Sequence, residues 1–388
     1  MTGRLVLRGL GSVGDLEGPR SLVTEDGRIA ALDAEAEAGA GAGAGADALD
    51  ARGLVAVPGF IELQLNGALG HDFTTAPASM WAVGLDLARD GVTAFLPTIV
   101  TSPPGTVDAA LAAWQAAPAT PRGAVPLGVH VEGPFIAPAR AGAHDPALLR
   151  DPDPGEIGRW AETGALRILT LAPERPGALE AIAQLSERGV VTSIGHTDAD
   201  APTTAAAIEA GARNATHLFN AMSPLGHRAP GAPGALLADP RVTVGLILDR
   251  HHLDPIVVGL VARLAAGRVS IVSDAIAAIG LPEGPNVLGG REVTVRDGAV
   301  RLPDGTLAGS ATPLSAGVRA FASITGSARA AVEAVTSTPA RLLGLADGRG
   351  TLAVGGRADV VLLDDALEVR ATIVGGELVH AAEELGWR

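Results

Sequence analysis

Cysteine, lysine and tyrosine are all missing from this chain of 388 residues, and each of its 29 Lys+Arg residues is an arginine. Without cysteine there can be no disulfide, thiolate ligand or cysteine nucleophile, so a metal ion must be held by His, Asp, Glu or amide side chains. Without lysine there can be no Schiff base, no P-loop lysine and no carboxylated lysine bridging two metal ions. With only 3% aromatic residues, the core must consist mainly of Leu, Val, Ile and Ala.

Basic stretches and long apolar runs are also missing. The net charge of -14 and the isoelectric point near 5.1 oppose binding to a polyanion, so no nucleic-acid partner is expected. No apolar run approaches the roughly 18 to 20 residues of a membrane span. The N-terminal apolar stretch is short and contains Arg4 and Arg8, unlike a signal peptide. The sequence therefore predicts a cytoplasmic protein without a membrane partner.

The middle of the chain alternates β-rich runs with Ala-rich helical stretches such as 80–91, 203–214 and 255–267. Such alternation is typical of a parallel sheet covered by helices, and eight strands indicate a (β/α)8 TIM-like barrel. A doubly wound open sheet is the alternative. The eight candidate strands are residues 55–66, 92–100, 125–133, 166–174, 190–197, 214–221, 242–252 and 269–276.

Both chain ends carry short β-rich runs with Gly turns, which predict one small β-sandwich domain built from residues 1–57 and 347–388. The barrel would then occupy residues 58–346. Between the N-terminal runs and the barrel, residues 34–53 alternate Ala and Gly, which indicates a flexible surface loop.

Polar residues gather where the predicted strands end. In nearly every strand the apolar run comes first, and a polar residue follows at its C-terminal end. Active sites of barrels are built at that end, so these side chains should converge on one pocket. The residues are Gln64, Glu132, Glu174, His196, His217, His252 and Asp274.

Four of these residues suggest a metal centre. Glu132, His196 and His217 offer a carboxylate and two imidazoles, which suit a divalent ion, and Asp274 would remain free as a base. Taken singly, each His is more often a hydrogen-bonded loop residue, and an Asp is often a helix cap. Their joint placement on strand ends favours the metal site. His130, two residues before Glu132, is expected to support the site or the core and not to bind the metal.

Nine motifs make the hypothesis specific, because in this order they resemble the N-acetylglucosamine-6-phosphate deacetylases of the amidohydrolase superfamily. The resemblance extends from about residue 50 to the end of the chain. The motifs are PGFIELQLNG, VHVEGPF, RAGAHDP, TLAPE, SIGHT, ATHLFNAM, LDRHHLD, SDA and LAGS.

The resemblance implies hydrolysis of the acetamide of N-acetylglucosamine 6-phosphate, in amino-sugar metabolism, by a homo-oligomer that we expect to be a dimer. It implies Glu132, His196 and His217 as metal ligands and Asp274 as general base and acid. The expected cofactor is one divalent metal ion per chain, with Zn²⁺ favoured. The implied substrate-binding residues are Ala143, His144, Asn220, Ala221, Arg228, His252, Leu307, Ala308 and Gly309.

The amides of PGFIELQLNG bear on the number of metal ions. Many amidohydrolases carry His-x-His at the end of the first strand, where this chain has Gln64 and Asn66 on one strand face. An amide is a weaker ligand than imidazole. We therefore expect a single tightly bound ion, with Gln64 and Asn66 orienting its water or the substrate.

The phosphate needs a cation in this acidic protein, and Arg228 is the candidate because a guanidinium binds phosphate with two hydrogen bonds. It would serve its own or a neighbouring subunit's site, whereas the adjacent His227 is expected to be solvated. Arg250 and His251 depart from the family pattern and bear on substrate identity.

Alternative functions make different demands on the sequence. An epimeric N-acetylhexosamine 6-phosphate would be cleaved by the same residues. An amidohydrolase acting on a cyclic amide or a base would be expected to carry His-x-His or a bridging lysine, and neither is present. A metal-free binding protein on this scaffold would be expected to have a broken ligand set, whereas this one is intact.

Overall fold

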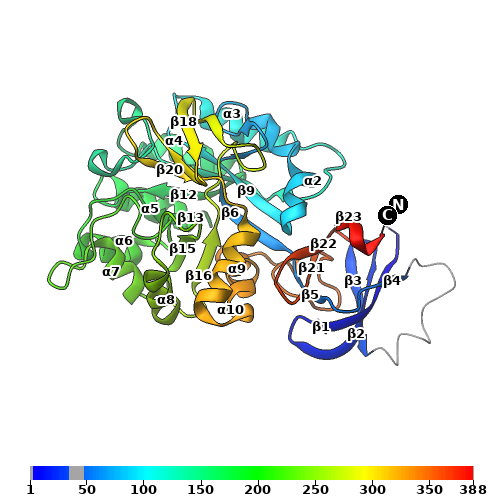
Figure 1. Cartoon of the computed structure of the whole chain (residues 1–388). Helices are drawn as coiled ribbons and strands as arrows, with labels where there is room; N and C mark the ends of the chain where they lie inside the picture. The colour runs from blue at the N-terminus through cyan, green and yellow to red at the C-terminus, as the bar shows by residue number, and fades with distance from the viewer. Residues whose placement is uncertain (1–2, 35–47, 388) are drawn as a thin grey trace.

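The computed structural model describes residues 3–34 and 48–387 of the chain. Figure 1 shows a barrel of strands covered by helices, with a separate group of strands from both chain ends beside it. Within the described residues, no helix is long and apolar enough to cross a membrane.

The barrel sheet is parallel, and its neighbours follow the chain order from β6 to β16. The first and last strands meet through a parallel bridge between Leu65 and Ala275. The N–H of Asp274 donates to the Gln64 carbonyl at 3.0 Å, and the N–H of Asn66 donates to the Ala275 carbonyl at 2.8 Å. The predicted (β/α)8 barrel is confirmed, and the open-sheet alternative is wrong. The strands are β6 (Phe60–Leu65), β9 (Val92–Val100), β11 (Val129–Glu132), β12 (Leu166–Leu171), β13 (Val191–Ile194), β14 (Asn214–Ala215), β15 (Thr243–Ile247) and β16 (Val269–Val272).

Helices follow the strands and cover the barrel (Figure 1). Three of them begin at an aspartate, Asp153, Asp200 or Asp254, whose side chain accepts a backbone N–H of the first turn, with a proline at the first or second helical position. The α-helices are α2 (Gly84–Leu87), α3 (Thr106–Gln115), α4 (Pro154–Glu162), α5 (Ala178–Glu187), α6 (Ala201–Ala210), α7 (Gly231–Ala238), α8 (Pro255–Leu264), α9 (Leu314–Thr325), α10 (Ala328–Glu333) and α11 (Ser337–Leu342). Short 3₁₀ helices are η1 (Pro77–Trp81), η2 (Ala88–Asp90), η3 (Pro138–Arg140), η4 (Pro146–Leu148) and η5 (Glu383–Leu385).

The main core lies between the barrel sheet and its helices. It consists largely of Leu, Val, Ile and Ala side chains, as the composition predicts. β9 is buried along its whole length, as expected for a parallel strand covered on both faces.

A small antiparallel sheet follows β16 and was not predicted from the sequence. It lies between β16 and α9, and Ser310 at its end bridges to Ala275 beside the barrel seam. The insertion therefore reaches the C-terminal end of the barrel. Its strands are β17 (Gly284–Leu288), β18 (Arg291–Arg296), β19 (Ala299–Arg301) and β20 (Leu307–Ser310); the remaining short strands are β7 (Gly67–Ala68), β8 (His71–Asp72) and β10 (Val125–Pro126).

The second large sheet joins the two chain ends through antiparallel pairing of β5 with β21. This confirms the small β domain; its boundaries at 57/58 and 346/347 stay a prediction. Most of the loop predicted over 34–53 lies outside the described residues, and the loop prediction is wrong for residues 48–50, which pair with β1. The strands are β1 (Leu5–Val13), β2 (Leu16–Glu25), β3 (Arg28–Ala34), β4 (Ala48–Asp50), β5 (Val55–Pro58), β21 (Val360–Leu363), β22 (Val369–Val374) and β23 (Glu377–Ala381).

Candidate active site

A cavity of about 310 Å³ opens at the C-terminal ends of the barrel strands. Loops after the strands and the β17–β20 insertion line it together. Twelve of the residues singled out in the sequence line this cavity: Asn66, Glu132, Ala143, His144, His196, His217, Asn220, Ala221, His252, Asp274, Leu307 and Gly309.

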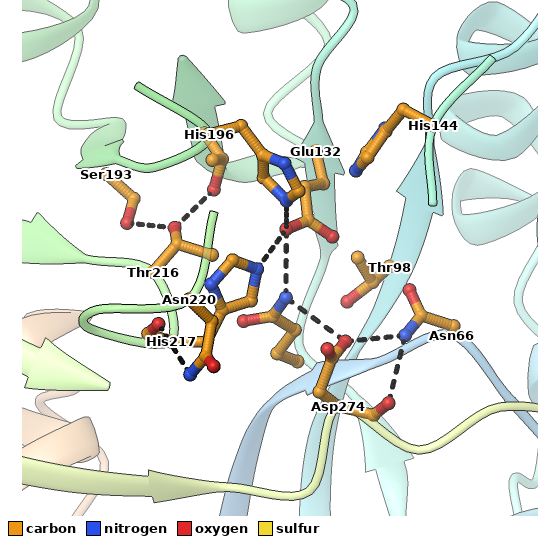
Figure 2. A network of polar contacts seen from close by, with 12 residues as sticks. Asn66, Thr98, Glu132, His144, Ser193, His196, Thr216, His217, Asn220 and Asp274 are labelled. Carbon is orange, nitrogen blue, oxygen red and sulfur yellow. Dashed lines mark hydrogen bonds and ion pairs between the residues drawn. The ribbon is translucent and has the colours of Figure 1, made fainter. Parts of the chain in front are cut away.

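Glu132, His196 and His217 converge in this cavity, and all three side chains are buried. One carboxylate oxygen of Glu132 lies 3.2 Å from Nε2 of His196 and 3.0 Å from Nε2 of His217. Figure 2 shows both rings pointing at this carboxylate, with Asp274 on the neighbouring side. Their ligand atoms lie within 4.8 Å of one another, so a single ion could be held between them.

The ring of His196 is oriented by a backbone carbonyl. Its Nδ1–H donates to the carbonyl of Arg140 at 2.9 Å, which turns Nε2 toward Glu132, the side on which a metal ion could bind. Gly195 precedes it because a Cβ there would lie 2.7 Å from the Cβ of Thr216. Local sequence and tertiary contact thus determine together where this imidazole points.

The charge state of the group follows from its mutual contacts. Burial works to raise the pKa of Glu132, but hydrogen bonds from His196 and His217 hold it well below its usual range. Burial works to lower the pKa of His217, but its hydrogen bond to Glu132 raises it. The group therefore favours a carboxylate with positive charge beside it.

Asp274 is held by the two amides of the first strand. Nδ2 of Asn66 donates to Oδ1 of Asp274 at 2.7 Å, and Nε2 of Gln64 donates to the same oxygen at 3.2 Å. Nε2 of Gln64 also lies 3.1 Å from Glu132 Oε1, so this amide connects Asp274 to Glu132. Burial first, and then the charge of Glu132, raise the pKa of Asp274 to about 6. A carboxyl group in that range can accept and return a proton near neutral pH.

Backbone strain concentrates at the same residues. His196, His217 and Asp274 have φ values of 49°, 27° and 48°, in the left-handed region that non-glycine residues rarely adopt. Each lies two residues beyond the end of a strand. Strained residues of this kind persist where the surroundings hold them, and they cluster at functional sites.

Two buried polar atoms in the group lack a partner. Oδ1 of Asn66 and Nδ1 of His217 are among the buried side-chain atoms for which the described residues provide no hydrogen bond. A buried polar atom without a partner costs free energy, so its persistence is a common mark of a ligand-binding site.

His144 is a neutral hydrogen-bond donor. The Thr101 N–H donates to its Nδ1 at 3.3 Å, and the Thr101 hydroxyl lies 2.7 Å from the same nitrogen. Nδ1 is therefore an acceptor, and the proton of the neutral ring resides on Nε2. Burial and the neighbouring His196 lower the pKa of His144 to about 3. Its ring packs edge-on against His196, with centroids 4.4 Å apart.

His252 is oriented by Asp249, which accepts from its Nδ1 at 2.7 Å. Burial would raise the pKa of Asp249, but the hydrogen bond from His252 outweighs burial and lowers it to about 2. Nε2 of His252 is then the nitrogen left for a ligand. Arg250 and His251 are exposed and do not line the cavity.

Five other residues lie away from the cavity lining. Arg228 is exposed, and its Nη1 lies 2.8 Å from Nε2 of His227, which is also exposed. Ala308 is buried beneath the lining. Glu174 accepts from the hydroxyl of Thr197 and from a neighbouring N–H in the loop after His196. His130 donates from Nδ1 to the Leu63 carbonyl and accepts at Nε2 from the Thr170 hydroxyl, so both of its nitrogens are engaged.

Arg140 is the main residue that the sequence reasoning missed. It lines the cavity, provides the carbonyl for His196, and forms an ion pair with Asp198 at 2.7 Å. The signal was its position within RAGAH, between Glu132 and His144. Leu288 and Thr306 were also missed, because they come from the unpredicted β17–β20 insertion.

Comparison with known proteins identifies the family. The model of the amidohydrolase family matches residues 55–379. N-acetylglucosamine-6-phosphate deacetylase of Bos taurus is 39% identical over 374 residues, 92% of this chain and 91% of that protein. N-acetylgalactosamine-6-phosphate deacetylase of Escherichia coli is 38% identical over 327 residues, 83% of this chain and 86% of that protein.

A solved structure agrees with these relatives. The N-acetyl-D-glucosamine-6-phosphate deacetylase of Mycobacterium smegmatis, as a mutant in complex with N-acetyl-D-glucosamine-6-phosphate, is 36% identical to this chain. The two structures superpose with a TM-score of 0.88, covering 97% of this chain and 99% of that one. The chain belongs to the amidohydrolase family and, within it, to the N-acetylglucosamine-6-phosphate deacetylases.

Proposed function

We propose that this chain hydrolyses the acetamide of N-acetylglucosamine 6-phosphate to glucosamine 6-phosphate and acetate, as a cytoplasmic enzyme of amino-sugar catabolism. The observation that carries the proposal is the buried Glu132–His196–His217 group beside an amide-held Asp274. Family membership supports it, because the curated relatives carry this activity in their names.

The three buried ligands would hold one divalent ion per chain, and Zn²⁺ is the ion that a Glu–His–His set suits best. When bound, such an ion lowers the pKa of a water and polarises a carbonyl group. The fit rests on the orientation of His196, whose Nε2 faces Glu132, and on the convergence of both rings on that carboxylate. Gln64 and Asn66 are hydrogen-bonded to the two carboxylates, which supports a role in orientation and not in binding a second ion.

Asp274 performs the proton transfers in this mechanism. Its carboxylate takes a proton from the attacking water as the new C–O bond forms at the acetamide carbon. It then delivers the proton to the amine nitrogen as the C–N bond breaks. A pKa near 6 allows both steps near neutral pH.

The remaining cavity residues would bind the sugar. The N–H at Nε2 of His144 is a candidate donor to a substrate oxygen. Nε2 of His252, whose Nδ1 is engaged by Asp249, is a second candidate contact with the sugar. The surrounding loops would contact the sugar through Ala143, Asn220, Ala221, Leu307 and Gly309, with Ala308 behind them.

The phosphate would be bound by Arg228. Because Arg228 is exposed and outside its own cavity lining, the proposal includes a homodimer in which it serves the neighbouring subunit's cavity.

Replacing Arg228 with Ala should weaken the transition-state complex with the phosphosugar by roughly 2 to 5 kcal/mol. The reaction with unphosphorylated N-acetylglucosamine should not change, and Arg188→Ala, on an exposed helix end, is the matched control. Equal losses with both substrates would assign Arg228 a structural role.

The test of the main proposal is a substrate comparison with the purified, zinc-loaded protein. N-acetylglucosamine 6-phosphate should give the highest kcat/KM, with stoichiometric release of acetate. The galactosamine epimer is the second candidate substrate, because a 38%-identical relative is an N-acetylgalactosamine-6-phosphate deacetylase. Failure to deacetylate any N-acetylhexosamine 6-phosphate would refute the proposal.

A further inference from the structure

Beneath the cavity lies a third carboxyl group that the mechanism does not use. Glu62 belongs to β6, and its residue is only 1% exposed. Its Oε1 accepts the backbone N–H of Gln64 at 2.9 Å, and its Oε2 accepts the backbone N–H of Ser273 at 2.9 Å. The carboxylate thus connects the first barrel strand to the chain that leaves the last one.

The seam that closes the barrel explains why an acceptor is needed there. Pairing of β6 with β9 is irregular between Glu62 and Leu65, the stretch that contains Gln64. Both N–H groups that Glu62 accepts therefore come from this irregular part of the barrel and from the chain beyond β16. Only a carboxylate offers two acceptor oxygens and no donor.

Burying the side chain of Glu62 costs free energy. A buried carboxylate is unfavourable without a cation, and no ion pair of Glu62 occurs among the described residues. An apolar side chain would avoid this cost, but it would leave two buried N–H groups without an acceptor. The cost is consistent with a function that depends on both hydrogen bonds.

Both hydrogen bonds end next to the catalytic groups. Ser273 directly precedes Asp274, whose φ of 48° is strained and must be held by its surroundings. Gln64 donates from its side chain to Asp274 and to Glu132. The Glu62 carboxylate thus holds the backbone next to Asp274 and the backbone of Gln64, whose side chain contacts Asp274.

We propose that Glu62 is a positioning residue that holds Asp274 in register with Gln64 across the barrel seam. The inference rests on the proposed function, because positioning matters only if Asp274 transfers protons. It predicts that disturbing Glu62 lowers kcat without weakening substrate or metal binding.

The first test uses Glu62→Gln, whose NH₂ group would face a backbone N–H in place of one acceptor oxygen. The variant should keep one metal ion per chain, while kcat falls by about 100-fold and KM stays within about two-fold. The matched control is Asp359→Asn, a buried carboxylate that accepts the N–H of Gly375 in the small β domain. The control should lose stability but keep its kcat. An unchanged kcat in Glu62→Gln, or an equal loss in the control, would overturn the proposal.

The second test does not depend on turnover. In a crystal structure of Glu62→Gln, the carboxylate of Asp274 should leave hydrogen-bond distance of Asn66 Nδ2; an unmoved Asp274 would overturn the proposal. If Glu62→Gln does not fold, Glu62→Asp serves both tests, because its shorter side chain keeps the charge but cannot span both N–H groups. If the wild-type protein deacetylates no hexosamine phosphate, the proposed function is refuted. The proposed role of Glu62 is still tested in that case, because the crystal structure shows whether Asp274 has moved.

Discussion

Two buried carboxylate clusters in this molecule have opposite surroundings. In the small β domain, Asp359 accepts from Nε of Arg349 at 3.0 Å, from Nε of Arg357 at 2.9 Å, and from the Gly375 N–H at 2.7 Å. In the barrel, Glu132 and Asp274 face imidazoles and amides, and no arginine forms an ion pair with either among the described residues.

The difference separates a cluster with a structural role from the cluster that we propose to be the active site. The charge of Asp359 is balanced by guanidinium groups, and none of the buried side-chain atoms without a partner comes from its cluster in the described part of the chain. The barrel cluster contains two such atoms, strained backbone and two carboxylates close together. A buried group of that kind is suited to binding a cation from outside the chain.

The largest effect should come from Asp274→Asn. Each proton transfer by such a group contributes on the order of a hundred- to ten-thousand-fold to the rate, so kcat should fall at least by that factor. Fold and metal content should remain, because Asp274 is not one of the three proposed ligands. Circular dichroism, metal analysis and steady-state kinetics check this. Near-normal turnover would remove Asp274 from the mechanism.

The corresponding change in the other cluster is Asp359→Asn. Removing one partner of a buried ion pair costs roughly 3 to 5 kcal/mol, so the free energy of unfolding should fall by that amount while kcat is unchanged. Denaturant unfolding of both variants makes the comparison direct. The distinction between the clusters fails if Asp359→Asn loses activity while remaining folded.

Metal removal should affect the barrel cluster alone. Zinc at about 100 times its dissociation constant should stabilise the protein by about 2.7 kcal/mol, and chelation should abolish turnover. Mass spectrometry should find one ion per chain, because amides replace the His-x-His pair. The same stabilisation is expected in Asp359→Asn. Two ions at full occupancy would show that Gln64 also acts as a ligand.

The smallest expected effect concerns pH. Burial raises the pKa of Glu62 from 4.5 to about 7, so the folded state holds this proton more tightly than the unfolded state. The stabilisation from the protonated form is complete below about pH 4.5 and is lost as the pH rises through about 7. The Tm of Glu62→Gln minus the Tm of wild type should therefore be larger at pH 8 than at pH 5. A difference that does not change with pH would contradict the raised pKa.

The sequence by itself determined the alternation of strands and helices, and it determined which residue types end each strand. These features are local, because burial of a parallel strand requires a continuous apolar run and its C-terminal end is the place for a functional side chain. Glu132, His196, His217 and Asp274 could be predicted for this reason, and the motif resemblance added the loop residues around them.

Only the tertiary structure decided how these residues are held. Asn66 contacts Asp274 across 208 positions, and Glu62 contacts Ser273 across 211, separations at which no local pattern carries information. The carbonyl of Arg140 beside His196 is a backbone contact, and a sequence motif does not specify where a carbonyl points. The exposure of Arg228 likewise follows from the path of its loop. Residue types follow from local chemistry, whereas their hydrogen bonds depend on how the barrel closes.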